Sequence, residues 1–101
     1  MNNTDTDLLP AVVMRPADGC ISSALDDGAV ILHLASGKYF GLNAVGARIW
    51  DLLDRPKPIS DIQATIRAEY NVDAERCDRE VLALLSDLKR AGLIEVENGV
   101  A

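Results

Sequence analysis

The stretch from Asp26 to Trp50, DDGAVILHLASGKYFGLNAVGARIW, constrains the fold more than any other part of the sequence. It contains two apolar runs with the two-residue alternation of β-strands, and turn residues precede each run. A pattern with the period of an α-helix follows directly. This order predicts two short strands that are joined by a tight turn and followed immediately by a helix.

Three antiparallel strands are predicted around this stretch. Cys20 to Leu25 is a weak first strand, and Asp26-Asp27-Gly28 forms the first turn, because glycine tolerates the positive φ of hairpin turns. Ala29 to Leu34 and Lys38 to Leu42 are the second and third strands, separated by Ala35-Ser36-Gly37. The last strand is predicted to be an open edge of the sheet, with main-chain N–H and C=O groups left unpaired.

Alternation sorts the side chains of these strands into two faces. In the second strand, one face carries Val30, Leu32 and Leu34, and the other carries Ala29, Ile31 and His33. In the third strand, one face carries Tyr39 and Gly41, and the other carries Phe40 and Leu42. This assignment defines the two faces of the predicted sheet.

Two helices are predicted after the sheet. Asn43 is a good N-cap for the first, which ends at the prolines in positions 56 and 58. Its apolar residues at helical spacing are Val45, Ile49, Leu52 and Leu53. Ser60 with Gln63 forms a capping box for the second helix, which runs to about Tyr70.

A third helix is the longest predicted element and runs from about Ala74 to Ala91. Asp73 caps its start, and Gly92 supplies a left-handed C-cap. Its apolar stripe consists of Cys77, Val81, Leu84, Leu85, Leu88 and Ala91. Residues 93–97 alternate and are a possible short final strand.

These elements fit one domain, since 101 residues leave no room for a second core. Residues 1–16 are predicted to be a flexible or extended N-terminal segment, residues 17–97 the folded domain and residues 98–101 a C-terminal tail. The order of a sheet, three helices and a possible last strand is typical of an α+β, winged-helix-like fold. In this fold a three-stranded antiparallel sheet packs on three helices.

Composition and charge argue against several classes of function. A net charge of −6 disfavours nucleic-acid binding, which depends on neutralising phosphates with Lys and Arg. No apolar run approaches the about 20 residues of a membrane span, and the polar start at Met1 does not resemble a signal peptide. We therefore expect a cytoplasmic protein that does not bind membranes. Cys20 and Cys77 are then expected to be small buried apolar residues rather than a disulfide.

Residues for catalysis or metal binding do not gather in a recognisable pattern. His33 is the single histidine and there is no CxxC pair, so a zinc site has almost nothing to build from. The serines have only His33 as a possible base, and most carboxylates fall in turns, caps and polar helix faces. Gly41 and Gly46 flank the strand–helix junction without matching a phosphate-binding motif. We expect no catalytic activity, no cofactor and no metal.

The third helix carries more apolar residues than its core stripe needs. Leu82 lies outside the stripe, beside Asp78, Leu85, Ser86 and Lys89. An unusually wide core face and a dimer contact are two explanations for this surplus. A third is a groove between the helix and the open strand, where unpaired main-chain groups and an apolar pocket capture a peptide by strand addition.

A winged-helix DNA-binding regulator is the alternative function for this shape. The third helix carries Arg76, Arg79, Lys89 and Arg90 against Glu75, Asp78, Glu80 and Asp87, so it is neutral. A recognition helix needs a surplus of Lys and Arg toward the phosphates. The charge balance therefore favours peptide binding over DNA binding.

Three segments resemble the PqqD-like proteins: LDDGAVILHLASGKYFGLNAVGARIWDLL, ISDIQATIRAEYNVDAE and EVLALLSDLKRAGLIE. The most specific pieces are Ser36 to Asn43 and Gly46 to Trp50, and the similarity extends from about Cys20 to Glu97. These proteins are the peptide-recognition domains of pathways that make ribosomally synthesised and post-translationally modified peptides (RiPP recognition elements). Within the family, the pattern is closer to the standalone members of lasso-peptide and radical-SAM peptide clusters than to the member of the pyrroloquinoline quinone pathway.

The resemblance implies a three-stranded sheet on three helices and a role without catalysis. It implies that the leader segment of a precursor peptide adds to the third strand, and that a separate leader protease or radical-SAM enzyme then acts on the peptide. Carried over by position, the main chain of Lys38, Tyr39, Phe40 and Gly41 pairs with the leader. On the helix side, Leu82, Leu85, Ser86 and Lys89 line the cleft, with Asp78 near its end. We expect a monomer or weak dimer in which Leu82→Asp abolishes peptide binding.

Overall fold

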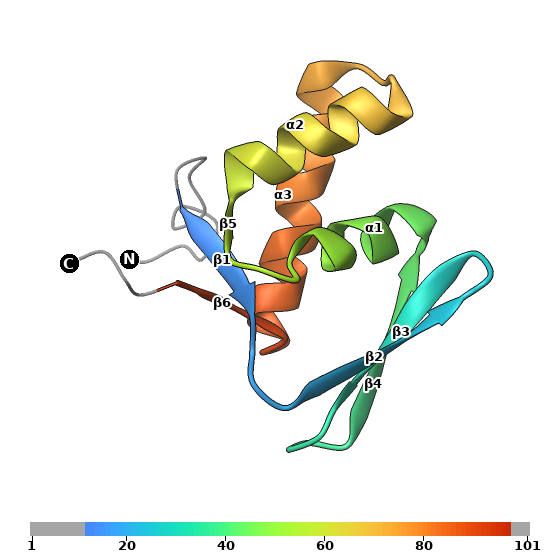
Figure 1. The fold of residues 1–101 in the computed structure, drawn as a ribbon, viewed down its shortest axis with the longest axis vertical. Coiled ribbons are helices and arrows are strands. Elements are labelled where there is room, and N and C mark those ends of the chain that lie inside the picture. The colour runs from blue at the N-terminus through green and yellow to red at the C-terminus, as the bar shows by residue number, and fades with distance from the viewer. Residues whose placement is uncertain (1–11, 98–101) are drawn as a thin grey trace.

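The structure, a computed structural model, describes residues 12–97 (Figure 1). Its elements are β1 (Val13–Pro16), β2 (Cys20–Leu25), β3 (Gly28–His33), β4 (Lys38–Asn43), α1 (Ala44–Leu52), β5 (Lys57–Pro58), α2 (Ile59–Tyr70), α3 (Ala74–Arg90) and β6 (Ile94–Val96). They form three helices and two three-stranded antiparallel sheets. The predicted α+β class, with a three-stranded antiparallel sheet on three helices, is confirmed.

The predicted meander is the sheet with strand order β2–β3–β4. Its strands lie within one residue of their predicted positions, since β3 begins at Gly28 and β4 ends at Asn43. The register pairs Ser22 with Ile31 and Ile31 with Phe40. In Figure 1 this sheet extends to the lower right, away from α2, while α1 lies directly above it. The sheet therefore projects from the helical part with much of its surface open.

Gly28 is needed for a different reason from the one predicted. The glycines with positive φ in the described chain are Gly19, Gly37 and Gly92, so the predicted positive φ at Gly28 is wrong. A Cβ atom on Gly28 would lie only 2.0 Å from the main-chain oxygen of Leu42. The close approach of the β4 backbone excludes a side chain at this position.

We expect Gly28→Ala to lower the free energy of unfolding by about 1–3 kcal/mol, the range for overpacked positions. The obstructing oxygen belongs to the backbone of Leu42, so the two strands must separate. Gly41→Ala is the matched control, because nothing lies within 4 Å of its Cβ position. Urea unfolding measures both variants, and equal stabilities would contradict the close-approach explanation.

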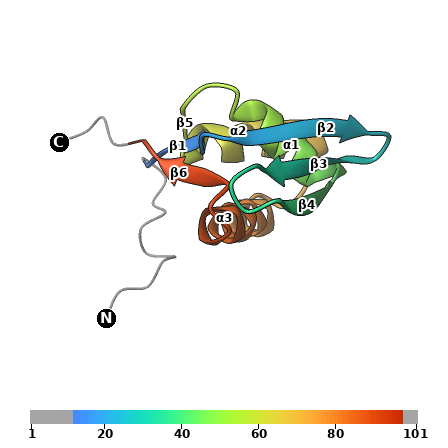
Figure 2. The ribbon, with the colours of Figure 1, turned by 90° about the horizontal axis from the view of Figure 1, so that it is seen from below.

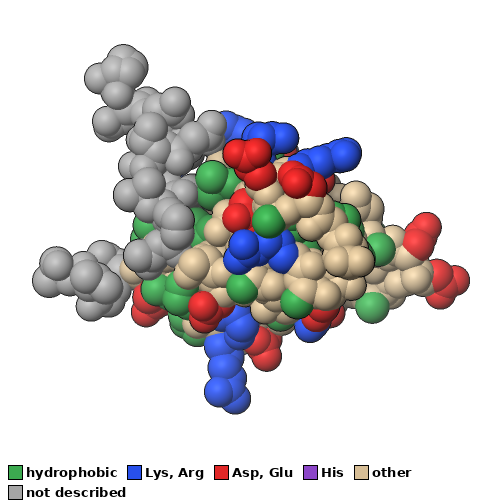
Figure 3. Space-filling model, turned by 90° about the horizontal axis from the view of Figure 1, so that it is seen from above, with side chains coloured by type: hydrophobic (Ala, Val, Ile, Leu, Met, Phe, Trp, Pro, Cys, Tyr) green, Lys and Arg blue, Asp and Glu red, His purple; other side chains and the backbone are tan. Residues whose placement is uncertain are grey.

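The core lies between this sheet and the helices. Ile31 is fully buried, and Phe40 and Leu42 are partly buried and pack against the core. These side chains belong to the face that alternation predicted for them, which α1 contacts through β3 and β4. Figure 2 shows the same layers from below, with the strands in front of α1. The opposite side of the molecule, seen from above, carries scattered Lys, Arg, Asp and Glu side chains (Figure 3).

Polar side chains cap the N-termini of α1 and α3, as predicted. The Oδ1 atom of Asn43 accepts a hydrogen bond from the main-chain N–H of Gly46 at 2.8 Å. The Oδ2 atom of Asp73 accepts one from the N–H of Arg76 at 2.9 Å. Each cap satisfies a main-chain N–H that has no partner within its helix. Both caps therefore fix where a helix leaves the preceding strand or loop.

The end of α3 is also set by local sequence. Gly92 has a φ of +82°, and the N–H of Leu93 donates to the oxygen of Leu88 at 3.0 Å. These are the features of a Schellman motif, in which glycine avoids the strain of a left-handed residue. The motif turns the chain from α3 into β6. The predicted glycine cap is confirmed.

The capping box predicted for α2 is wrong. The helix begins at Ile59, and its N-cap residue Pro58 has no side-chain cap, so Ser60 lies inside the first turn. Gln63 is buried, and its Nε2 atom donates to the main-chain oxygen of Asp78 at 3.2 Å. Packing of α2 against α3 therefore decides where the Gln63 side chain lies, which the local sequence does not reveal.

A second sheet, with strand order β5–β1–β6, was not predicted. Its central strand β1 lies in the segment expected to be extended, and Met14 in that strand is fully buried. Arg15 forms ion pairs with Glu95 of β6, at 2.7 Å, and with Glu97, the residue after that strand, at 3.1 Å. Residues 13–16 of the predicted N-terminal segment therefore belong to the folded unit. Residues 1–11 of that segment and the predicted C-terminal tail, residues 98–101, lie outside the described residues.

The two cysteines are free thiols. Cys77 is buried as expected, whereas Cys20 is partly exposed, with its Sγ atom 3.9 Å from the main-chain oxygen of Leu93. Desolvation raises the pKa of both thiols, and nearby carboxylates add to this increase. A raised pKa keeps the thiols protonated and weakly nucleophilic.

Candidate functional site

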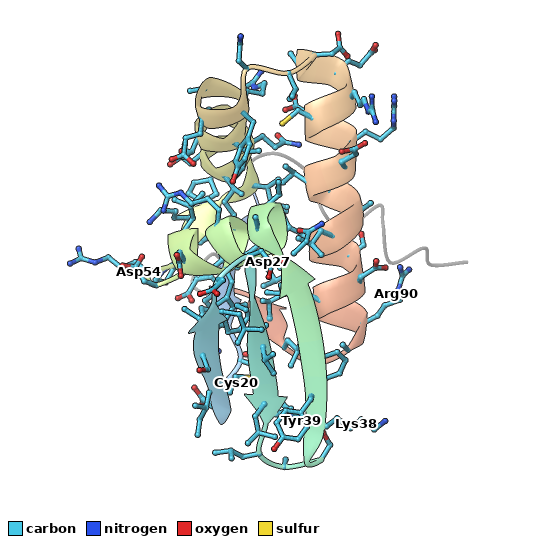
Figure 4. The ribbon with its side chains drawn as sticks, turned by 90° about the vertical axis from the view of Figure 1, so that its right-hand side faces the viewer. Cys20, Asp27, Lys38, Tyr39, Asp54 and Arg90 are labelled. Atoms are coloured by element: carbon cyan, nitrogen blue, oxygen red, sulfur yellow. The ribbon has the colours of Figure 1, made fainter. Side chains whose placement is uncertain are left out.

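The outer edge of β4 is an unpaired edge of its sheet. Within residues 12–97, β4 pairs with β3 alone. Figure 4 shows this edge beside α3, with Lys38 and Tyr39 at the end of β4 that is farthest from α1. The predicted arrangement of an open strand next to the third helix is therefore present.

The hydrogen-bonding direction of each β3 residue follows from one contact. The N–H of Leu34 donates to the main-chain oxygen of Gly19 at 2.9 Å, so Leu34 directs its main-chain groups toward β2. Successive residues of an antiparallel strand direct these groups to opposite sides. Leu32 therefore also bonds toward β2, whereas Ile31 and His33 bond toward β4.

The register carries this alternation into β4. Lys38 is opposite His33 and Phe40 is opposite Ile31, so both use their main-chain groups inside the sheet. The main-chain N–H and C=O groups of Tyr39 and Gly41 point outward. Of the four strand residues expected to pair with a leader, two therefore have open hydrogen-bonding groups.

α3 has two different flanks on either side of its buried stripe. Leu82 and Leu84 are two residues apart, which is about 200° around an α-helix. Asp78, one turn before Leu82, contacts α2 twice: its carboxylate lies 3.4 Å from the Nε atom of Arg67, and its main-chain oxygen accepts from Gln63. The flank of Asp78 and Leu82 is therefore the one beside α2.

The opposite flank of α3 borders the end of β4. A pocket of about 280 Å³ lies there, between α1, α2 and α3. Its lining includes Asn43 of β4, Val45 and Ile49 of α1, Tyr70 of α2, and Glu80 and Leu84 of α3. Most of the lining is apolar, and Glu80 is the one carboxylate among the described residues that form it. The pocket extends the open edge into a site for a side chain.

An ion pair joins two walls of this pocket. The guanidinium of Arg48 on α1 contacts the carboxylate of Glu69 on α2 through both Nε and Nη2, the shortest distance being 2.7 Å. The hydrogen bond from Arg48 lowers the pKa of Glu69, and the same bond raises the pKa of Arg48. Both groups therefore stay charged near neutral pH, and the pair holds α1 and α2 together beside Tyr70.

The structure does not bring the predicted helix residues together at β4. Leu85 is fully buried and belongs to the core. Ser86 is also buried, with 3% of its surface exposed. Leu82 and Ser86 line a separate hollow on α3 with Arg79. Leu84 was assigned to the core stripe, and no signal in the sequence distinguishes it from the other stripe residues. The geometry therefore places Leu84 rather than Leu82 beside the end of β4.

Groups with the potential for catalysis are scattered. Within residues 12–97, no three His, Cys, Asp or Glu side chains gather as metal ligands. The Nδ1 atom of His33 lies 2.8 Å from the Oγ atom of Ser36, which also accepts from the N–H of Lys38 at 3.3 Å. These contacts are exposed and stabilise the β3–β4 turn. In the same range, no helix is long and apolar enough to span a membrane.

The fold defines a small α+β domain in which the outer edge of β4, beside α3, is available to an added chain. The chain belongs to the PqqD family, described as coenzyme PQQ synthesis protein D, and the match covers residues 28–94. A comparison with curated protein sequences gave no match.

Three solved structures are similar to this chain. The structure of TbiB1 in complex with the TbiA(beta) leader peptide is 40% identical, with a TM-score of 0.74, over 86% of this chain and 98% of that one. Lasso peptide synthetase B1 complexed with the leader peptide is 28% identical, with a TM-score of 0.72, over 81% and 96%. The PqqD truncation of Methylobacterium extorquens PqqCD, a stand-alone RiPP recognition element, has a TM-score of 0.75 over 92% and 99%. At 19% identity, this last likeness shows the fold alone.

Proposed function

We propose that this protein is a non-catalytic adaptor that binds the leader segment of a ribosomally made precursor peptide by strand addition to β4. It presents the peptide to a separate modifying enzyme or leader protease, in a pathway of the lasso-peptide type. The open outer edge of β4 is the observation that carries this proposal. Support comes from two similar structures, TbiB1 and lasso peptide synthetase B1, each of which holds a leader peptide.

Affinity comes from the main chain of the edge. Tyr39 and Gly41 each offer an outward N–H and C=O, and such groups pair with an extended peptide whatever its side chains. The edge thus supplies binding energy without selecting a sequence.

Selectivity comes from the pocket at the end of β4. Its volume of about 280 Å³ is below the about 300–1,000 Å³ of sites for drug-sized ligands, so it suits one large side chain. The apolar walls favour an aromatic or branched aliphatic residue of the leader. Glu80 and Tyr70 add polar groups for the tip of that residue. We assign no direct leader contact to Lys38, Phe40, Asp78, Leu82, Leu85, Ser86 or Lys89.

The charges on α3 give the DNA-binding alternative no support. The Nε atom of Arg76 lies 3.0 Å from the carboxylate of Glu80, and the Nη2 atom of Arg90 lies 2.6 Å from that of Asp87. Two of the four basic residues on the helix therefore already face acidic partners. A phosphate backbone would have to compete with these pairs.

Amide hydrogen exchange tests the proposed pairing at single residues. On addition of the leader peptide, we expect the amides of Tyr39 and Gly41 to gain protection of about tenfold or more, because they acquire partners. The amides of Phe40 and Leu42 are already bonded to β3 and should change much less. They serve as internal controls. Equal protection along the whole strand, or none at Tyr39 and Gly41, would contradict strand addition at this edge.

A further inference from the structure

The sheet β2–β3–β4 has an outer face opposite the side that packs on α1. The register places Ile21, Leu32 and Tyr39 in one row across the three strands. Ser23, Val30 and Gly41 form the next row, and Leu25, Gly28 and Asn43 the row after it. All of these residues alternate with the inward-facing Ile31 and Phe40. They define the outer face of the sheet.

This outer face is uncharged and mostly apolar, with Ser23, Asn43 and the hydroxyl of Tyr39 as its polar groups. Three of its large side chains are well exposed: Ile21 at 54%, Leu25 at 53% and Tyr39 at 70%. None of its residues in the three strands is Asp, Glu, Lys or Arg. The chain has a net charge of −6 and its opposite side carries charges of both signs (Figure 3), so the lack of charge distinguishes the outer face. The largest exposed apolar patch on a monomer is often functional.

We propose that the outer face docks the enzyme that processes the bound peptide, through an apolar and uncharged surface on that enzyme. This inference rests on the proposed function. Tyr39 and Gly41 belong to both surfaces, because their main-chain groups form the peptide-binding edge and their Cα atoms are part of the outer face. An enzyme on the outer face therefore lies next to a peptide paired with β4.

The size of the face favours a transient partner over a second copy of this chain. Each strand has six residues and spans about 20 Å, and three strands are about 10 Å across. The face thus offers on the order of 200 Å², whereas a stable interface buries about 800 Å² per partner. A weak contact of this kind is sufficient when the precursor peptide binds the adaptor and the enzyme at the same time. The peptide then holds the two proteins together and raises the effective concentration of the enzyme at the outer face.

Ile21→Asp tests the inference with a matched control. Ile21 lies on β2, two strands from the β4 edge, so the variant charges the outer face without touching the peptide site. Ser22→Asp places the same charge on the next residue, which is exposed and on the opposite face. The measurements are the affinity for the leader peptide and the cleavage rate of the full precursor by the pathway's leader peptidase.

We expect Ile21→Asp to lower the cleavage rate at subsaturating adaptor by at least about tenfold while leader affinity stays within about twofold. Ser22→Asp should change neither quantity. Equal effects of the two variants, or unchanged cleavage with Ile21→Asp, would overturn the docking surface. A dimer of the native chain that Ile21→Asp dissociates, seen by sedimentation, would assign the face to a second copy and also overturn it. Absence of leader binding by the native chain would instead refute the proposed function.

Discussion

Gly41→Pro should reduce leader affinity by at least about tenfold while the protein stays folded. Proline removes the outward N–H of Gly41 and places a ring carbon where the added strand must lie. The internal pairing of β4 with β3 does not use this N–H, and proline is tolerated on an edge strand when its nitrogen faces solvent. The variant loses one main-chain hydrogen bond and the close approach of the added strand. Together these losses cost more than about 1.4 kcal/mol of binding free energy, which corresponds to a tenfold loss of affinity.

Gly41→Ala is the control for this variant. It adds a side chain into open space and keeps the N–H group. Calorimetric titration should therefore show affinity close to that of the native chain for Gly41→Ala and strongly reduced affinity for Gly41→Pro. If the proline variant binds as tightly as the alanine variant, then the outer edge of β4 does not pair with the leader.

Leu84→Ala should lower leader affinity by about fivefold to tenfold, because the pocket at the end of β4 loses one apolar wall. Leu82→Ala should leave the affinity unchanged, since Leu82 lies on the flank of α3 beside α2. Both side chains are partly buried against the core, so the two variants lose comparable stability. Circular dichroism and urea unfolding verify that both remain folded under the assay conditions.

This pair of variants decides between two placements of the groove. The sequence favoured Leu82, because it is the apolar residue left over when the core stripe of α3 is complete. The structure favours Leu84, because that residue lines the pocket together with Asn43 of β4. A loss of affinity confined to Leu82→Ala would return the groove to the flank that the sequence indicated.

The position of the site was predictable in part. Resemblance of the SGKYFGLN segment to the family pattern predicts β4 as the strand to which we propose the leader adds, and turn residues place the ends of β4 within one residue. Which of its residues have open hydrogen-bonding groups depends on the pairing of β2 with β3. That pairing, visible in the contact of Leu34 with Gly19, is outside β4 itself. The helix side was not predictable, since an apolar stripe does not reveal which flank faces the sheet.

The sequence by itself determined the elements whose signals are local. Asn43, Asp73 and Gly92 set helix ends through contacts within a few residues, and the two-residue alternation set the faces of β3 and β4. These features depend on the propensities and hydrogen bonds of neighbouring residues, so they can be read in order along the chain.

Tertiary structure alone decided the features that join distant segments. β1 became a central strand because Met14 pairs with Lys57 and Val96, which are far along the chain. Gln63 left its predicted cap because the burial of α2 against α3 gave its amide a partner on Asp78. In each case a contact between residues far apart in sequence outweighed a local preference, and the pocket beside β4 arises in the same way.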